Sequence, residues 1–162
     1  RLQGSVDDLM RLARDVPGDR RSVDVSGFIN NAAATWRSRL SPARRLEVQL
    51  PDGLSRITVS ESALHQILEV LIDNAIQHGD GTITISAREL HGGVVIDVGD
   101  EGAGLSDPQH IFERRRSGNG GSGIGLALAR SLAQAEQGRL TLLARGAHPV
   151  FRLAFIVHND EG

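Results

Sequence analysis

An asparagine in the segment LEVLIDNAIQHGDG has the chemistry needed to hold a metal ion. Asn74 lies just off an apolar helical stripe, so its side-chain amide can face a cleft. An amide oxygen is a hard, neutral ligand of the kind that Mg²⁺ accepts when the ion bridges phosphates. A polar residue beside a helix stripe is more often simply solvated or capping, so this segment alone leaves both interpretations open.

A carboxylate in the segment IDVGDEGAGL is a second candidate. The pattern predicts a strand that delivers Asp100 into a loop with Gly102 and Gly104, and such glycines let the backbone approach a ligand closely. A buried carboxylate there could accept a hydrogen bond from an adenine amine, and it needs such a partner because an unpaired buried charge is costly. An ordinary glycine turn remains the alternative.

A glycine run in the segment SGNGGSGIGLALAR leads directly into a predicted helix. Successive backbone N–H groups at a helix N-terminus form a ready anion site. The run is not a P-loop, because the lysine and the Ser/Thr of that pattern are missing. It also does not follow a strand, as a dinucleotide fingerprint should. A flexible linker or an ordinary helix start remains the alternative.

Hydrophobic periodicity predicts the elements that must position these segments. A predicted helix begins at Ser60, a good N-cap residue followed by Glu61. Helices are predicted over residues 1–16, 25–40, 60–78 and 108–112 and from residue 124, and strands over 46–50, 56–59, 82–88, 94–98, 140–143 and 150–157. The 82–88 and 94–98 strands should form an antiparallel hairpin. This order predicts an α+β fold, a two-layer sandwich with a mixed, mostly antiparallel sheet covered on one face by helices.

Composition excludes several classes of function. The formal net charge of −2 and the 3% aromatic content give no electrostatic or stacking argument for nucleic acid. The absence of cysteine excludes disulfides and thiolate metal sites. The sequence contains neither a signal peptide nor an apolar run long enough to span a membrane. Because the chain begins at Arg1, we expect a fragment of a longer protein.

Taken in order, the three segments closely resemble the motifs of the Bergerat-type ATPases, a family that includes gyrase, the Hsp90 chaperones, MutL and the histidine kinases. Asn74 matches the N box, and Asp100, Gly102 and Gly104 match the first glycine box, DxGxG. Residues 111–114, Ile-Phe-Glu-Arg, resemble the F box of histidine kinases, and residues 122–126, Ser-Gly-Ile-Gly-Leu, match the second glycine box. The resemblance covers about residues 25–157.

The resemblance implies ATP and Mg²⁺ as cofactors. The asparagine matching Asn74 would hold Mg²⁺, the aspartate matching Asp100 would recognise the adenine amine, and the loop between F box and second glycine box would form a lid. The residues expected to bind the nucleotide are Asn74, His78, Asp100, Gly102, Gly104, Leu105, Arg114, Gly121, Ser122, Gly123, Ile124, Gly125 and Leu126.

The resemblance also implies a division of labour between domains. Residues 1–18 resemble the tail of a dimerisation helix, and residues 19–162 the ATP-binding catalytic domain of a sensor histidine kinase. None of the six histidines has the setting of a phospho-acceptor. We therefore expect no catalytic residue in the fragment and no activity without the kinase's own dimerisation and acceptor domain. A response regulator would be the further partner. The fragment should be monomeric and cytoplasmic, within a homodimeric parent that a membrane could anchor.

Three departures from the family pattern keep a second function open. Val70 stands where histidine kinases usually have another asparagine and where hydrolysing members have the glutamate that activates water. The adjacent Glu69 should point elsewhere, because successive residues of a helix are rotated by about 100°. Gln77 stands where a lysine is common, and Arg114-Arg115-Arg116 replaces the second phenylalanine of the F box. The alternative is a degenerate nucleotide-sensing or protein-interaction module with weak or no ATP binding. A hydrolysing ATPase of the gyrase type fits less well than either.

Overall fold

The computed structural model of the chain describes residues 19–103, 111–113, 123–143 and 148–157. The helix expected over residues 1–16, most of the one expected over 108–112 and the expected lid lie outside these residues. Within the described residues, no helix has both the length and the apolarity needed to cross a membrane.

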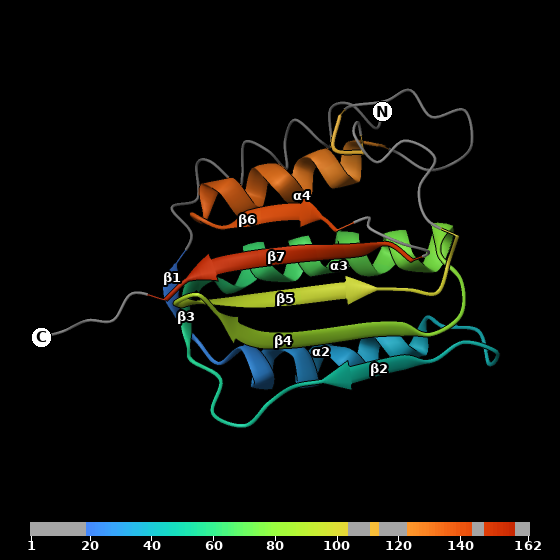
Figure 1. Ribbon diagram of the computed structural model, residues 1–162, viewed down its shortest axis with the longest axis horizontal. Helices are drawn as coiled ribbons and strands as arrows, with labels where there is room; N and C mark the ends of the chain where they lie inside the picture. The colour runs from blue at the N-terminus through green and yellow to red at the C-terminus, as the bar shows by residue number, and fades with distance from the viewer. Residues whose placement is uncertain (1–18, 104–110, 114–122, 144–147, 158–162) are drawn as a thin grey trace, which may run out of the picture.

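A five-stranded sheet forms one layer of the molecule (Figure 1). Its strand order is β2-β4-β5-β7-β6, with β2 and β4 parallel and every other neighbouring pair antiparallel. The strands are β2 (Leu46–Gln49), β4 (Ile83–Leu90), β5 (Gly93–Gly99), β6 (Arg139–Leu142) and β7 (Val150–Ile156). This is the mixed, mostly antiparallel sheet that the sequence predicts, including the hairpin of β4 and β5.

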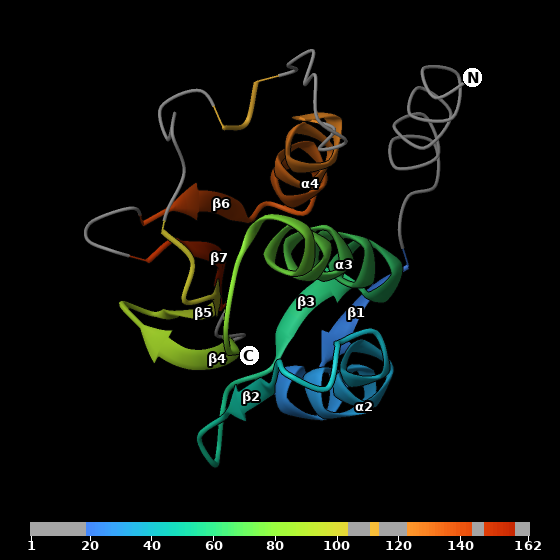
Figure 2. The same ribbon diagram turned by 90° about the vertical axis from the view of Figure 1, so that its right-hand side faces the viewer.

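Three helices pack on one side of this sheet, as Figure 2 shows. They are α2 (Val25–Ser38), α3 (Glu61–His78) and α4 (Gly123–Ala135). The central helix α3 begins at the predicted N-cap, where the Ser60 hydroxyl accepts a hydrogen bond from the Ala63 N–H at 3.3 Å. Its apolar stripe is fully buried and consists of Leu64, Ile67, Leu68, Leu71, Ile72 and Ala75. The predicted two-layer arrangement is therefore confirmed.

A short strand near the start of the described chain was not predicted. Strand β1 (Arg20–Val23) pairs antiparallel with β3 (Ile57–Ser60) in a separate two-stranded sheet. Three of its four residues are exposed, and only Val23 is buried, so the sequence has no alternation of the kind that marks a strand. Its partner strand, which lies more than thirty residues away in sequence, supplies the ladder.

A buried carboxylate links this small sheet to two of the helices. Glu136, only 7% exposed, follows α4 and accepts a hydrogen bond from the backbone N–H of Ser60. The Arg20 guanidinium lies 3.8 Å from the same carboxylate and also donates to the Glu136 carbonyl at 3.3 Å. The start of α3 and the end of α4 are thus fixed to each other and to β1.

Candidate functional site

The predicted ligand-binding residues of the first two segments that the structure describes gather at one edge of the molecule. Helix α3 ends there at His78, and strand β5 ends there at Gly99, just before Asp100. Both ends lie at the right-hand edge in Figure 1, and Figure 2 looks onto that edge. The fold therefore brings the first two candidate segments together, although Asn74 and Asp100 are distant in the sequence.

The Asp100 carboxylate lies against the backbone that follows α3. Its Oδ1 accepts hydrogen bonds from the backbone N–H of Gly102 at 2.6 Å and from that of Asp80 at 3.4 Å. The residue is half-buried. One oxygen is therefore held by the protein, while Oδ2 has no protein donor among the described residues.

Two glycines make room for this carboxylate. A Cβ atom on Gly79 would overlap the Asp100 carboxyl group, and one on Gly102 would lie 2.7 Å from Asp100 Oδ1. Real Cβ atoms are not found at such distances, so any larger residue at either position would displace the carboxylate. Gly79 ends helix α3 and Gly102 belongs to the DxGxG loop, so both segments are shaped around one acidic side chain.

Arg44 fixes the end of α3 at this edge. Its guanidinium donates to the carbonyls of Ala75 at 3.1 Å, Ile76 at 3.0 Å and Gly81 at 2.9 Å. A cation on the last carbonyls of a helix stabilises its C-terminus. Arg44 was not predicted from the sequence, because nothing in its own segment indicates that it contacts a helix more than thirty residues further on.

The last turn of α3 presents Asn74, Gln77 and His78. Asn74 is half-buried, and the other two residues are exposed. Residues three and four apart share one face of a helix, so these side chains lie beside one another. None of the three makes a side-chain hydrogen bond within the described part of the chain.

Val70 occupies the same face one turn before Asn74 and faces Gly125 of the second glycine box. A Cβ atom on Gly125 would lie 3.5 Å from Val70 Cγ1, an ordinary van der Waals distance. The neighbouring Glu69 is turned away and accepts hydrogen bonds from Trp36 at 3.0 Å and Arg39 at 2.6 Å. The prediction that Glu69 points elsewhere is thus confirmed.

The F-box phenylalanine is anchored between the sheet and α4. The ring of Phe112 meets that of Phe151 edge-on, with centroids 6.0 Å apart. The Arg130 guanidinium of α4 lies 5.4 Å from the Phe112 centroid, within cation–π range. These contacts attach the short described segment 111–113 to the same side of the molecule as the second glycine box.

The predicted nucleotide-binding residues are only partly within the described part of the chain. Gly104, Leu105, Arg114, Gly121 and Ser122 lie outside the described residues, as does the side chain of Ile124. Gly123 begins helix α4, and further along it Leu126 is buried in the core. A second residue that the sequence analysis missed does reach the site, since the His148 ring contacts the Gly102 carbonyl at 2.9 Å.

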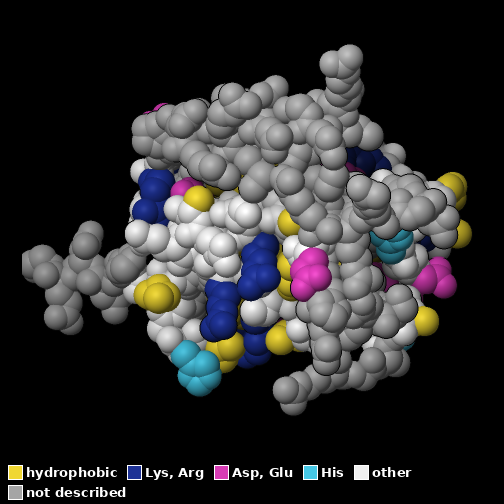
Figure 3. Space-filling view, turned by 90° about the horizontal axis from the view of Figure 1, so that it is seen from above, with side chains coloured by type: hydrophobic (Ala, Val, Ile, Leu, Met, Phe, Trp, Pro, Cys, Tyr) yellow, Lys and Arg dark blue, Asp and Glu magenta, His cyan; other side chains and the backbone are white. Residues whose placement is uncertain are grey.

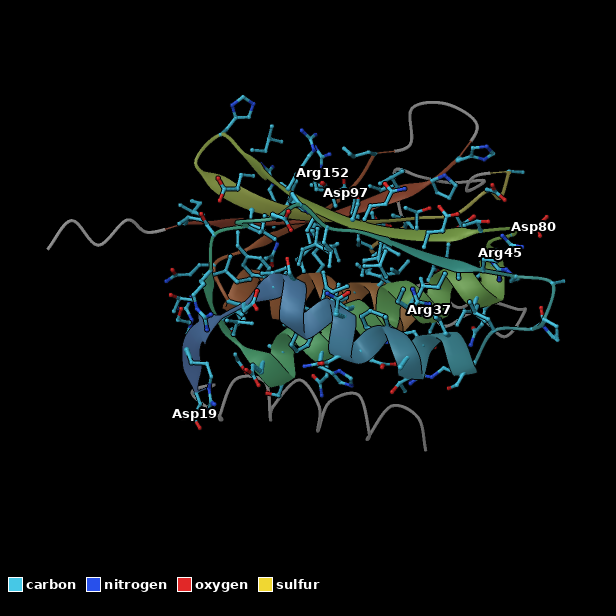
Figure 4. The ribbon with its side chains drawn as sticks, turned by 90° about the horizontal axis from the view of Figure 1, so that it is seen from below. Asp19, Arg37, Arg45, Asp80, Asp97 and Arg152 are labelled. Carbon is cyan, nitrogen blue, oxygen red and sulfur yellow. The ribbon has the colours of Figure 1, made fainter. Side chains whose placement is uncertain are left out.

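Strands β5 and β7 carry an ion pair away from this edge. On the sheet face opposite the helices, the Arg152 guanidinium makes two 2.8 Å hydrogen bonds to the Asp97 carboxylate (Figure 4). The hydrogen bond to Asp97 raises the pKa of Arg152 above its ordinary value. Seen from above, basic side chains form a small group with an acidic side chain beside them (Figure 3).

A separate groove of about 560 Å³ opens at the opposite end of the helices. It lies between β1 and the first turns of α2 and α3, and Phe28, Arg56, Glu61 and His65 are among the residues that line it. None of the predicted ligand-binding residues in the described part of the chain lines this groove. No group of acidic or histidine side chains suited to holding a metal ion occurs among the described residues.

Sequence comparison relates the chain to known proteins. The family model described as histidine kinase-, DNA gyrase B- and HSP90-like ATPase matches residues 59–157. The chain is 30% identical over 151 residues to the signal transduction histidine-protein kinase BaeS of Escherichia coli, with 83% of the chain and 32% of BaeS covered. It is 34% identical over 166 residues to the sensor histidine kinase YkoH of Bacillus subtilis, with 95% and 36% covered. The chain thus spans about a third of the length of these curated relatives.

Solved structures share the fold. The Acinetobacter baumannii histidine kinase AdeS superposes with a TM-score of 0.78 at 19% identity, covering 96% of this chain and 77% of that one. Full-length ShkA in complex with AMPPNP superposes with a TM-score of 0.75 at 24% identity, covering 94% and 36%. At these identities the likeness establishes the architecture alone.

Proposed function

The chain belongs to the family of histidine kinase-, DNA gyrase B- and HSP90-like ATPases, as the catalytic ATP-binding domain of a sensor histidine kinase, and we propose that it binds Mg-ATP for transfer of the γ-phosphoryl group to a histidine on a separate domain. The relatives named above are kinases and give no support to the alternative of a degenerate module. Because the chain spans only about a third of them, the activity of the whole protein is part of this proposal.

The setting of Asp100 is the single observation that carries the proposal. Its Oδ1 is held by the Gly102 N–H at 2.6 Å, while Oδ2 has no described protein donor. A carboxylate oriented in this way can accept a hydrogen bond from an exocyclic amine. The space kept open by Gly79 and Gly102 fits this assignment, since a side chain at either position would overlap or crowd the carboxylate.

Asn74 is the residue that would hold the metal ion. It lies one turn before the end of α3, half-buried and without a described hydrogen-bond partner. When bound, ATP would supply the phosphoryl group and Mg²⁺ would neutralise charge on the phosphates. The backbone N–H groups at the start of α4, beside Val70, would bind phosphate oxygens because the first turn of a helix leaves them without intrahelical partners.

The remaining assignments follow from this proposal. Residues 19–162 would form the ATP-binding domain, and residues 1–18 the end of a dimerisation helix. The acceptor domain of the same kinase and a response regulator would be its partners, and the parent would be a homodimer. Gly104, Leu105, Arg114, Gly121, Ser122, Ile124, Leu126 and His78 remain proposed nucleotide contacts.

Calorimetric titration with ATP, with and without Mg²⁺, tests the proposal directly. We expect binding in both conditions and tighter binding when the metal ion is present. The absence of any heat of binding from a chain with native circular dichroism would favour the protein-interaction module instead.

We also expect no autophosphorylation of residues 1–162 alone. Incubation with ATP labelled on the γ-phosphate, followed by detection of acid-labile phosphate, measures this. Adding an acceptor domain from a related kinase provides the positive control, since the nucleophilic histidine would then be present. Stoichiometric phosphohistidine on any of the chain's own six histidines would contradict the proposed division of labour.

A further inference from the structure

A histidine from outside the recognised motifs contacts the loop that carries Asp100. The Nδ1 atom of His148 lies 2.9 Å from the carbonyl oxygen of Gly102. Because a carbonyl can only accept, Nδ1 must carry the proton and donate it. Gly102 is thereby held on both sides, since its own N–H donates to Asp100 Oδ1 at 2.6 Å.

The sheet register explains how this histidine reaches the loop. Strands β5 and β7 are antiparallel, and their last pair at this edge is Gly99 with Val150. Beyond that pair, the chain continues through Asp100 on one side and back through Pro149 to His148 on the other. The two segments therefore run beside each other, and His148 lies next to the DxGxG loop.

The neighbouring proline limits the freedom of His148. Pro149 is buried, and its ring fixes its own φ angle. The residue before a proline is restricted to extended conformations. Although the His148 side chain is exposed, its backbone is therefore oriented before any ligand binds.

From these contacts we propose that His148 is a positioning residue for adenine recognition. Its Nδ1–H holds the Gly102 carbonyl and so keeps the loop in the shape that presents Asp100 Oδ2 to the base. His148 acts through the loop and does not itself touch the nucleotide. The inference rests on the proposed function, because it requires that Asp100 recognise the adenine amine.

The test compares variants that either keep or lose a donor at the position of Nδ1. Asparagine places its amide nitrogen as far along the side chain as Nδ1, whereas glutamine places it one bond further. We expect His148→Ala and His148→Gln to weaken ATP binding about two- to tenfold, and His148→Asn to restore most of the affinity. Affinities are measured by calorimetry on residues 1–162. His91→Asn, in the turn between β4 and β5, is the matched control and should bind like the unmodified chain.

A second nucleotide separates positioning from a general loss of structure. Purine riboside triphosphate lacks the 6-amino group, so its binding should depend little on either Asp100 or His148. We expect His148→Ala to weaken ATP more than this analogue, and to add little to the effect of Asp100→Asn in the double variant. If His148→Ala loses its native circular dichroism, the ATP affinities of His148→Asn and His148→Gln are compared instead, and the asparagine variant should bind ATP more tightly.

Two results would overturn the inference while leaving the proposed function intact. One is that all His148 variants bind ATP normally while Asp100→Asn binds it poorly. The other is that the His148 variants weaken ATP and the analogue equally. If Asp100→Asn itself leaves ATP affinity unchanged, the adenine assignment fails, and the inference about His148 fails with it.

Discussion

The two halves of helix α3 use their polar side chains in different ways. In the first half, Glu69 is bonded to Trp36 of α2 and to Arg39 directly after that helix, and the Ser60 hydroxyl caps α3. In the second half, Asn74 and His78 have no side-chain hydrogen bond within the described residues. The comparison indicates that Glu69 in the first half stabilises the fold, whereas Asn74 and His78 in the second half are available to a ligand. Substitutions at these two sets of residues should therefore have separable effects.

The largest expected effect is on the ligand-binding end. Replacing Asp100 with Asn removes a charged acceptor, which should cost about 1.5–3 kcal/mol of ATP binding free energy. Each 1.4 kcal/mol is a factor of ten in dissociation constant, so calorimetry should show about a tenfold to hundredfold weaker complex.

Asp97→Asn is the matched control for that substitution. Asp97 lies on the same strand, β5, but pairs with Arg152 on the sheet face opposite the helices (Figure 4). The control variant should lose some stability and keep its affinity for ATP. If Asp100→Asn is folded and binds ATP normally, the edge formed by Asp100 and the end of α3 is not the nucleotide-binding site.

The opposite result is expected at the first half of α3. Glu69→Ala leaves the indole N–H of Trp36, a residue only 1% exposed, without its acceptor. An unsatisfied buried donor costs about 1–3 kcal/mol. Urea denaturation should show a loss of this size, whereas ATP affinity should remain within about twofold once the protein is folded.

Asp73→Ala is the control for that experiment. Asp73 is exposed and contacts Arg39 at 3.2 Å, so its removal should cost less than about 1 kcal/mol. The division of α3 would be wrong if Glu69→Ala reduced ATP affinity without changing stability.

A smaller, metal-dependent effect is expected at Asn74. Replacing Asn74 with Ala should weaken Mg-ATP binding about two- to tenfold, with little change for ATP in the presence of a chelator. Asn31→Ala, on α2 at the opposite groove, is the control because it removes the same side chain far from the site. If Asn74→Ala loses the same factor of ATP affinity with and without Mg²⁺, Asn74 does not hold the metal ion.

The smallest effect concerns the pH dependence of stability. Burial raises the pKa of Glu69, but the hydrogen bonds from Arg39 and Trp36 outweigh it, and the pKa lies below its ordinary value of 4.5. The resulting stabilisation is present above pH 4.5 and is lost as the pH falls through the lower, folded-state value. Glu69→Gln should flatten this acid limb by a few tenths of a kcal/mol, measured by urea denaturation between pH 6 and pH 3. If Glu69→Gln loses as much stability between pH 6 and pH 3 as the unmodified chain, other carboxylates cause the acid sensitivity.

Local patterns determined much of this architecture. The apolar stripe of α3, the Ser60 cap, the strands of the main sheet and the direction of Glu69 all follow from residues within one or two turns or one strand of each other. Helical and extended periodicities are properties of neighbouring residues, so a single sequence is enough to predict them. The order of the candidate motifs was likewise visible without coordinates.

Contacts between distant segments were decided by the tertiary structure alone. Strand β1, the Arg44 contacts at the end of α3 and the reach of His148 to Gly102 all join residues separated by more than thirty positions. Each of these contacts depends on which elements are neighbours and, in the sheets, on the register in which the strands pair. No local sequence pattern predicts either of these. The sequence by itself determined which residues could bind a nucleotide and on which elements they lie. Only the packing of those elements decided which residues hold them in place, because such contacts exist only once the sheet order has brought distant backbone segments together.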